Sequence, residues 1–135
     1  SADGHFVNYV KSVNEKGELT TTTIWYRNER MADSTKVVTE GKHPSTRIYR
    51  YGADGKQFES IVMNDENIIT HKYFQLMSEN GNQLKYENWS YSKKRGLRCT
   101  NKAISEENAQ GLLTKKTYYW YGKLKSETSF SYTYF

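Results

Sequence analysis

The sequence predicts an all-β protein whose strands follow one another in an antiparallel meander. A glycine-based turn followed by an alternating strand recurs four times, around Gly17, Gly55, Gly81 and Gly122. Asp-Gly and Asn-Gly pairs, which occur at two of these turns, supply the positive φ angles that tight hairpins need. The chain also contains 12 Tyr, 3 Trp and a single Pro, and aromatic residues suit the pleated surface of a sheet.

The order of the elements follows from alternation of apolar and polar residues and from β-branched runs. Residues 27–34 are polar and are interpreted as a connection or a strand edge, and residues 41–45 hold the only Pro and form a loop. Residues 104–113 are the one helix candidate, because Ser105 can cap a helix and two Glu follow where the helix dipole favours anions. The predicted strands cover residues 8–13, 19–26, 35–39, 46–51, 57–63, 68–77, 83–91, 97–103, 112–121 and 124–135.

The length and composition indicate one domain over residues 1–135. A chain of 135 residues has the length of a single domain, and no linker or shift in composition divides it. A meander of about 8–10 strands leaves two free edges that must be protected. We therefore expect an antiparallel barrel, which removes the edges, or a strongly curved half-barrel.

Aromatic residues on both faces of several strands suggest a ligand cavity. A cavity walled by Tyr and Trp, with Arg among them, suits a small hydrophobic or aromatic ligand. The alternative is that these rings only stabilise the sheet by cross-strand pairing. The candidate lining residues are Trp25, Arg47, Tyr49, Tyr51, Trp89, Tyr91, Tyr119 and Tyr121.

The net charge of +5 is concentrated in the second half of the chain. Its densest point is a basic patch formed by Lys93, Lys94, Arg95 and Arg98. Such a patch is suited to an acidic protein or an anionic surface, and the alternative is a solvated loop. No RNA- or DNA-binding signature extends it.

Catalytic and metal-binding constellations are missing from the sequence. His5, His43 and His71 do not have the spacing of metal ligands. Arg98 could lower the pKa of the neighbouring Cys99, but with no suitably placed His a buried or incidental thiol is the favoured interpretation. We therefore expect no catalytic residue, no metal and no cofactor.

Compartment is left open by the sequence. The single cysteine excludes an internal disulfide, and no stretch approaches the roughly 20 apolar residues that span a bilayer. The chain begins without Met, so a targeting segment that has been removed would be compatible with a soluble secreted or periplasmic protein.

Two resemblances to known families are present. Gly4-His5-Phe6 resembles the Gly-x-Trp signature of the lipocalin-like (calycin) barrels, with Phe6 where Trp is expected. This resemblance implies a closed barrel that holds a small hydrophobic ligand. Residues 49–56 and 121–127 resemble the units of bacterial YD or variant-MORN hairpin repeats, which implies a surface-exposed interaction module without catalysis. The glycine turns are unevenly spaced, and true arrays keep a constant period, so we expect one closed sheet.

The favoured hypothesis from the sequence is non-catalytic binding of a small hydrophobic or aromatic ligand in a barrel cavity. One alternative is a protein- or glycan-binding sheet that uses exposed Tyr and Trp. A further alternative is an enzyme that acts on a ligand held in the barrel.

Overall fold

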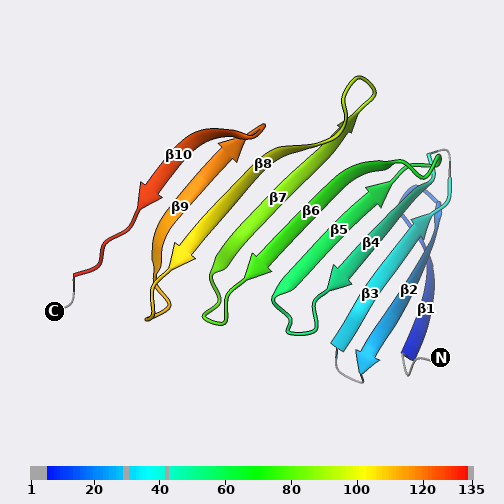
Figure 1. Cartoon of the computed structure of the whole chain (residues 1–135). Helices are drawn as coiled ribbons and strands as arrows, with labels where there is room; N and C mark the ends of the chain where they lie inside the picture. The colour runs from blue at the N-terminus through cyan, green and yellow to red at the C-terminus, as the bar shows by residue number, and fades with distance from the viewer. Residues whose placement is uncertain (1–5, 29–30, 42, 134–135) are drawn as a thin grey trace.

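The structure is a computed structural model that describes residues 6–28, 31–41 and 43–133. These residues form one ten-stranded antiparallel sheet in which every strand pairs with the next one along the chain (Figure 1). The all-β meander is therefore confirmed. The strands are β1 (Phe6–Val13), β2 (Leu19–Asn28), β3 (Met31–Thr39), β4 (Ser45–Tyr51), β5 (Gln57–Met63), β6 (Ile69–Met77), β7 (Gln83–Ser92), β8 (Gly96–Glu107), β9 (Leu113–Trp120) and β10 (Lys123–Ser129).

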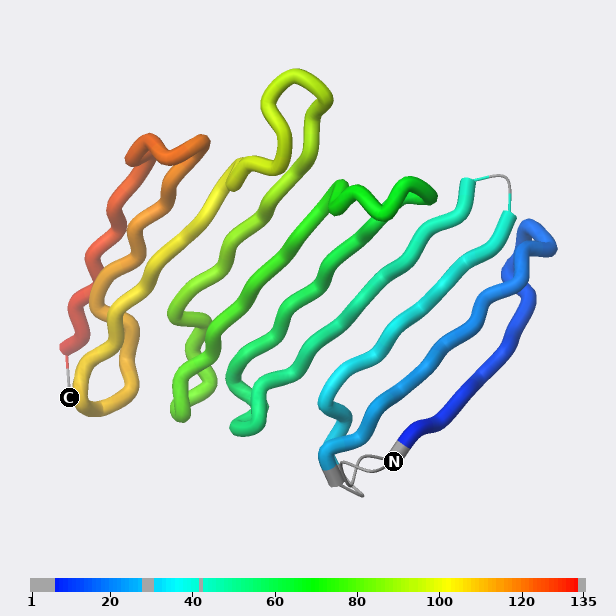
Figure 2. Tube along the Cα trace, turned by 45° about the vertical axis from the view of Figure 1, so that its right-hand side comes forward, coloured from blue at the N-terminus to red at the C-terminus, as the bar shows by residue number. Residues whose placement is uncertain are grey.

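The sheet is open, in contrast to the closed barrel, which was one of the two forms expected from the sequence. β1 and β10 lie at opposite ends of a twisted layer (Figures 1 and 2). β10 is short and fully exposed, and its register shifts between Leu124 and Ser126. It also carries Lys123, Lys125 and Glu127. Short, bulged and charged strands are the usual protection of an exposed edge, so this edge is stable in water without closure.

The helix predicted over residues 104–113 is wrong. These residues end β8, turn at Asn108 and begin β9. The Asn108 side-chain oxygen accepts hydrogen bonds from the backbone N–H groups of Gln110 and Leu112, both at 3.0 Å. Gly111 has φ of 80°. Ser, Asn and acidic residues favour both helix caps and turns, because their side chains form hydrogen bonds with nearby backbone groups. Composition alone therefore did not distinguish a helix start from a turn.

The same turn recurs elsewhere in the meander. Asn14 accepts from the N–H groups of residues 16 and 18, and Asn64 accepts from those of residues 66 and 68. In each case the fourth residue of the turn has a positive φ, 78° at Gly17 and 60° at Asn67. The Asn side chain thus fixes a local turn that the following left-handed residue completes.

Two further element boundaries differ from the prediction. The polar residues 27–34 are largely strand, because β2 continues to Asn28 and β3 starts at Met31. The register between β2 and β3 shifts on both sides of Tyr26, which leaves one unpaired residue on each strand. At the other end, β10 stops at Ser129, and Tyr132 instead donates its hydroxyl to the Leu113 carbonyl at 2.7 Å.

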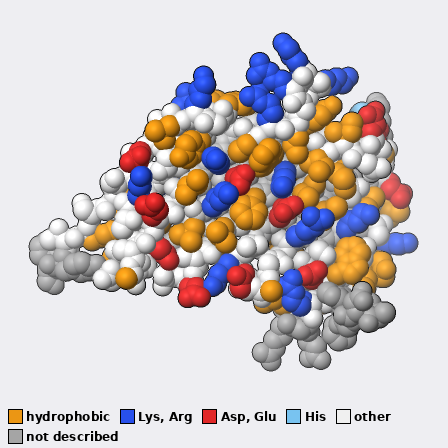
Figure 3. All heavy atoms as spheres, in the orientation of Figure 1, with side chains coloured by type: hydrophobic (Ala, Val, Ile, Leu, Met, Phe, Trp, Pro, Cys, Tyr) orange, Lys and Arg blue, Asp and Glu red, His pale blue; other side chains and the backbone are white. Residues whose placement is uncertain are grey.

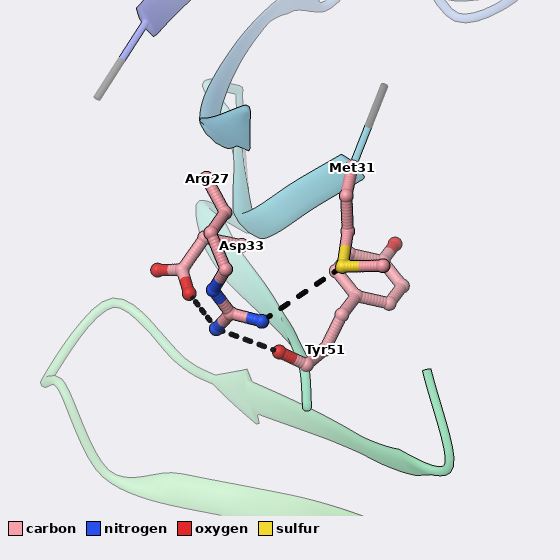
Figure 4. Close-up of polar contacts among 4 residues, drawn as sticks. All are labelled: Arg27, Met31, Asp33 and Tyr51. Carbon is pink, nitrogen blue, oxygen red and sulfur yellow. Dashed lines mark hydrogen bonds and ion pairs between the residues drawn. The ribbon is translucent and has the colours of Figure 1, made fainter. Parts of the chain in front are cut away.

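A polar clasp joins the end of the β2–β3 hairpin to β4 (Figure 4). The Arg27 guanidinium forms an ion pair with Asp33 and donates to the carbonyl oxygen of Tyr51 at 3.4 Å. It also contacts the sulfur of Met31 at 3.9 Å. Because β2 and β4 are not paired with each other, this clasp fixes the hairpin end relative to its second neighbour.

The sheet has no covering layer in the described part of the chain. Only Ile61, 7% exposed, and Ala103, 2% exposed, are buried among the described apolar residues. Domains are ordinarily built from at least two packed layers. Both faces of this sheet are therefore candidate functional surfaces.

Candidate binding faces

Directly paired residues in an antiparallel sheet point to the same face, so the register assigns each side chain to one of the two faces of the sheet. The aromatic face is defined by three cross-strand rows. From β4 toward β9 they read Arg47-Val62-His71-Ser90-Arg98, Tyr49-Ser60-Tyr73-Asn88-Asn101-Trp120 and Tyr51-Phe58-Gln75-Tyr86-Ala103-Tyr118. None of these residues is Asp or Glu, and most of the polar ones are amides or hydroxyls.

The rings of the aromatic face contact one another across strands. Phe58 of β5 lies 5.6 Å from Tyr51, 6.1 Å from Tyr49 and 6.2 Å from Tyr73 between ring centroids. Such spacings are those of favourable aromatic pairs, which contribute about 0.5–1.5 kcal/mol each beyond area burial. The rings therefore form a ladder over three strands.

Amide groups continue this surface between the rings. The Tyr73 hydroxyl donates to Gln75 at 2.8 Å, and Gln83 donates to the same Gln75 oxygen at 3.0 Å. Burial, followed by the neighbouring Tyr118, raises the pKa of Tyr86, while a hydrogen bond with Asn101 opposes the shift. Tyr86 is therefore neutral at physiological pH, and the middle of the aromatic face is partly shielded from water.

A shallow notch interrupts the aromatic face. It has a volume of about 130 Å³, and its lining includes Ser60, Val62, His71, Tyr73, Asn88 and Ser90. The notch forms because short side chains on neighbouring strands leave a gap beside Tyr73. Pockets for small organic ligands are usually about 300–1,000 Å³, so this notch is the size of a single side chain.

The opposite face is defined by the row Arg50-Glu59-Phe74-Glu87-Lys102-Tyr119 and is called the charged face. Arg50 pairs with Glu59 at 3.6 Å, and Lys85 pairs with Glu87 at 3.0 Å. Side chains of both signs are interspersed with hydrophobic ones over this face (Figure 3).

Lysine side chains cover the aromatic groups of the charged face. The ammonium groups of Lys72, Lys85 and Lys102 lie 5.9, 5.9 and 5.0 Å from the ring centroids of Trp89, Phe74 and Tyr119, respectively. Long cationic side chains shield apolar surface while their charged ends stay in water. The charged face is therefore adapted to solvent, in contrast to the aromatic face.

The candidate ligand residues do not lie together. Arg47, Tyr49 and Tyr51 belong to the aromatic face, whereas Trp25, Trp89, Tyr91 and Tyr119 share the charged face. Tyr121 lies in the β9–β10 turn. Sequence reasoning missed most of the aromatic residues of the aromatic face, because alternation assigns faces within a strand but not between strands. The missed aromatic residues are Phe58, Tyr73, Tyr86, Tyr118 and Trp120.

The predicted basic patch forms the tip between β7 and β8. Lys93, Lys94 and Arg95 are exposed in the connection. Arg95 and Arg98 join Tyr121 and Lys123 of the neighbouring β9–β10 turn around an open pocket of about 480 Å³. Lys123 was not predicted as part of this site because it is remote in sequence from the basic patch. The hairpin turn around Gly122 that holds Lys123 was predicted.

The surroundings of Cys99 disfavour its thiolate form. It pairs in register with Trp89 on the charged face, whereas its neighbour Arg98 pairs with Ser90 on the aromatic face. Burial, followed by the charge of Glu87, raises the pKa of Cys99. Arg98, which could have lowered this pKa, lies on the opposite face, because adjacent strand residues point to opposite faces.

We expect native Cys99 to react with iodoacetamide at pH 8 several-fold more slowly than the same protein unfolded in urea. The thiolate is the nucleophile, and a raised pKa lowers its fraction in the folded state. The measurement is the alkylation rate followed by mass spectrometry. Equal rates in the folded and unfolded protein would contradict the assignment.

Metal and membrane signals are missing from the described part of the chain. No group of three or more His, Cys, Asp or Glu side chains there is placed to hold a metal ion. His5, like Gly4 of the lipocalin-like motif, lies outside the described residues. The described residues contain no helix of the length and hydropathy needed to cross a membrane.

Comparison with known proteins gives one structural similarity. No protein-family model matches the chain, and no curated protein matches it. Among solved structures, the chain is similar to a crystal structure of a protein with unknown function from Bacteroides fragilis NCTC 9343. That match has a TM-score of 0.36 and 9% sequence identity, and it covers 96% of this chain and 95% of the other.

Proposed function

We propose that this protein is a non-catalytic binding module that docks a protein partner on its aromatic face. The observation that carries the proposal is an uncovered sheet face whose three cross-strand rows hold seven aromatic rings and no carboxylate. The centres of protein interfaces are enriched in Tyr, Trp, Phe and Arg and depleted of Glu, Asp and Lys. Arg47 and Arg98 in the outer row fit the same pattern.

The large exposed surface supports a macromolecular partner. The chain exposes 9592 Å², whereas a compact monomer of 15.8 kDa is expected to expose about 7,300 Å². The excess of about 2,300 Å² exceeds the surface that one partner of a standard protein interface buries. A flat face of this kind also favours a macromolecule over a small ligand, because the notch on it is only about 130 Å³.

The notch gives the proposed interface a centre. Binding hot spots are usually side chains that insert into well-packed pockets near the middle of an interface. The notch lies among the rows of the aromatic face, beside Tyr73. The resemblance to hairpin-repeat interaction modules also agrees with this function.

The proposal is tested by placing a photocrosslinking phenylalanine analogue at one of two positions and irradiating cells of the source organism. Phe58 lies on the aromatic face and Phe74 on the charged face, on neighbouring strands β5 and β6. We expect a discrete crosslinked protein from position 58 and none in common from position 74. Two results would contradict the proposal: the same crosslinked protein from both positions, or no crosslinked protein from either position.

A matched pair of substitutions then measures the contribution of the face to affinity for the crosslinked protein. Tyr118 and Tyr119 are consecutive in β9 and point to opposite faces. Tyr118→Ala is expected to weaken binding by about tenfold or more, as for an aromatic hot spot, and Tyr119→Ala by less than about threefold. Isothermal titration calorimetry with both folded variants makes the comparison.

A further inference from the structure

The pocket between the β7–β8 tip and the β9–β10 turn brings together three cations from two separate parts of the sequence. Arg95 and Arg98 come from the tip and the start of β8, and Lys123 comes from the start of β10. Both connections lie at the same end of the strands, where Lys and Arg side chains gather (Figures 1 and 3). The pocket has a volume of about 480 Å³, which is within the usual range for ligand sites.

Among the described residues, no carboxylate forms an ion pair with these cations. The sequence contains no Asp or Glu over residues 88–105 or 108–126. Within the described residues, the ion pairs of the molecule involve neither of the two arginines nor Lys123. Like charges held near one another are unfavourable unless an anion joins them, so the pocket is complementary to a ligand with more than one negative charge.

Tyr121, which lines the pocket, has an unfavourable backbone conformation. It has φ of 48° and precedes Gly122, with φ of 78°, in a two-residue connection between Trp120 and Lys123. Such hairpin turns favour Asn or Gly at the first position, and a bulky residue with positive φ is unusual. Among the described residues, the other positive-φ positions are glycines and Asn67. Strain of this kind is often retained at functional sites.

The Tyr121 ring holds Arg98 in place. The guanidinium carbon of Arg98 lies 4.9 Å from the ring centroid, and the ring itself packs edge-on against Trp120 at 5.2 Å. The Tyr121 N–H donates to the Thr100 carbonyl at 2.8 Å, which fixes the turn against β8. A planar guanidinium stacked on a ring loses less freedom when it binds, and its fork geometry matches an oxyanion bidentately.

We propose that Arg95, Arg98 and Lys123 form a binding site for a phosphate-type oxyanion, with Tyr121 positioning Arg98. The ligand is one or two phosphate groups, carried either by a small soluble phosphate compound or by a lipid headgroup. The site shares Arg98 with the outer row of the aromatic face, but it is proposed to bind phosphate in the absence of a protein partner.

The test uses inorganic pyrophosphate and two kinds of vesicle as probes at physiological ionic strength. Pyrophosphate is titrated into the full chain by calorimetry, with NMR detection of the arginine side chains. Binding is then measured to phosphatidylcholine vesicles with and without phosphatidic acid. We expect saturable one-to-one binding of pyrophosphate, saturable binding to vesicles that contain phosphatidic acid, or both. Binding of pyrophosphate alone indicates a soluble phosphate ligand, and binding of the vesicles alone indicates a lipid headgroup.

Lys102 provides a matched control on the same strand. Its ammonium lies 5.0 Å from the Tyr119 ring, but on the charged face. Arg98→Ala is expected to weaken binding about tenfold or more, since a charge-assisted hydrogen bond contributes about 1.5–3 kcal/mol. Arg98→Lys, which keeps the charge, should also weaken it several-fold, and Lys102→Ala less than about twofold.

Two results would overturn the phosphate site. One is the lack of saturable binding to either probe by a folded protein. The other is an equal loss of binding in Arg98→Ala and Lys102→Ala, which would indicate a diffuse positive surface. Circular dichroism of each variant establishes that the sheet is intact, so loss of fold is distinguished from loss of the site.

Discussion

Ile61→Ala is expected to lower the free energy of unfolding by about 2–3 kcal/mol, near the lower end of the range for buried Ile truncation. Ile61 is 7% exposed and lies on β5, between Ile48 of β4 and Lys72 of β6 in register. In a single-layer sheet the substitution removes contacts that no second layer can replace. Equilibrium unfolding in urea, followed by tryptophan fluorescence, measures the loss.

Ile104→Ala is the matched control for this substitution. Ile104 of β8 lies on the same charged face, paired with Lys85, but it is 38% exposed. Its truncation should cost less than about 1 kcal/mol, because much of its surface already meets water. Equal losses for the two variants would show that burial within a face does not stabilise this sheet, and that backbone pairing alone holds it.

The strands and most turns of this fold were predictable because their signals are local. A period of two in the sequence defines a strand, and Asp-Gly or Asn-Gly defines its turn. The turn at Asn108 was the exception. Ser105, Glu106 and Glu107 favour a helix start, and only the Asn-x-x-Gly spacing shared with Asn14-Glu15-Lys16-Gly17 indicates a hairpin.

The candidate binding face was less predictable, because it depends on register. Register shifts such as the one between Asn88 and Trp89 reverse the relation of faces within a pair of strands. Pairing across β4 to β7 places Tyr49 on the same face as Asn88, so Trp89, the next residue, lies on the opposite face. Trp89 and Tyr49 were assigned to one cavity from the sequence. Closure of the sheet was equally inaccessible, since it depends on whether the two edge strands meet.

The contact between neighbouring turns gives the second large effect, at Gly111. Gly111 has φ of 80°, and a Cβ added there would lie 2.6 Å from Cγ and 2.9 Å from Cβ of Asn80 in the β6–β7 turn. Asn82 of that turn donates to the Gly111 carbonyl at 2.7 Å and to Glu107 at 2.8 Å. The two turns therefore pack together, and a methyl group at position 111 would separate them.

Gly111→Ala is expected to destabilise the protein by about 2–3 kcal/mol, of which about 1–2 kcal/mol is the left-handed backbone of a non-glycine residue. Gly81→Ala isolates that backbone cost, because Gly81 has a similar φ of 84° with nothing within 4 Å of an added Cβ. Urea unfolding of both variants gives the difference, which we attribute to the Asn80 contact. If the two variants lose the same stability, the turns do not support each other and each hairpin of the sheet is held by its own strands. A larger loss for Gly111→Ala means that the close packing of Gly111 against Asn80 couples the β8–β9 turn to the β6–β7 turn.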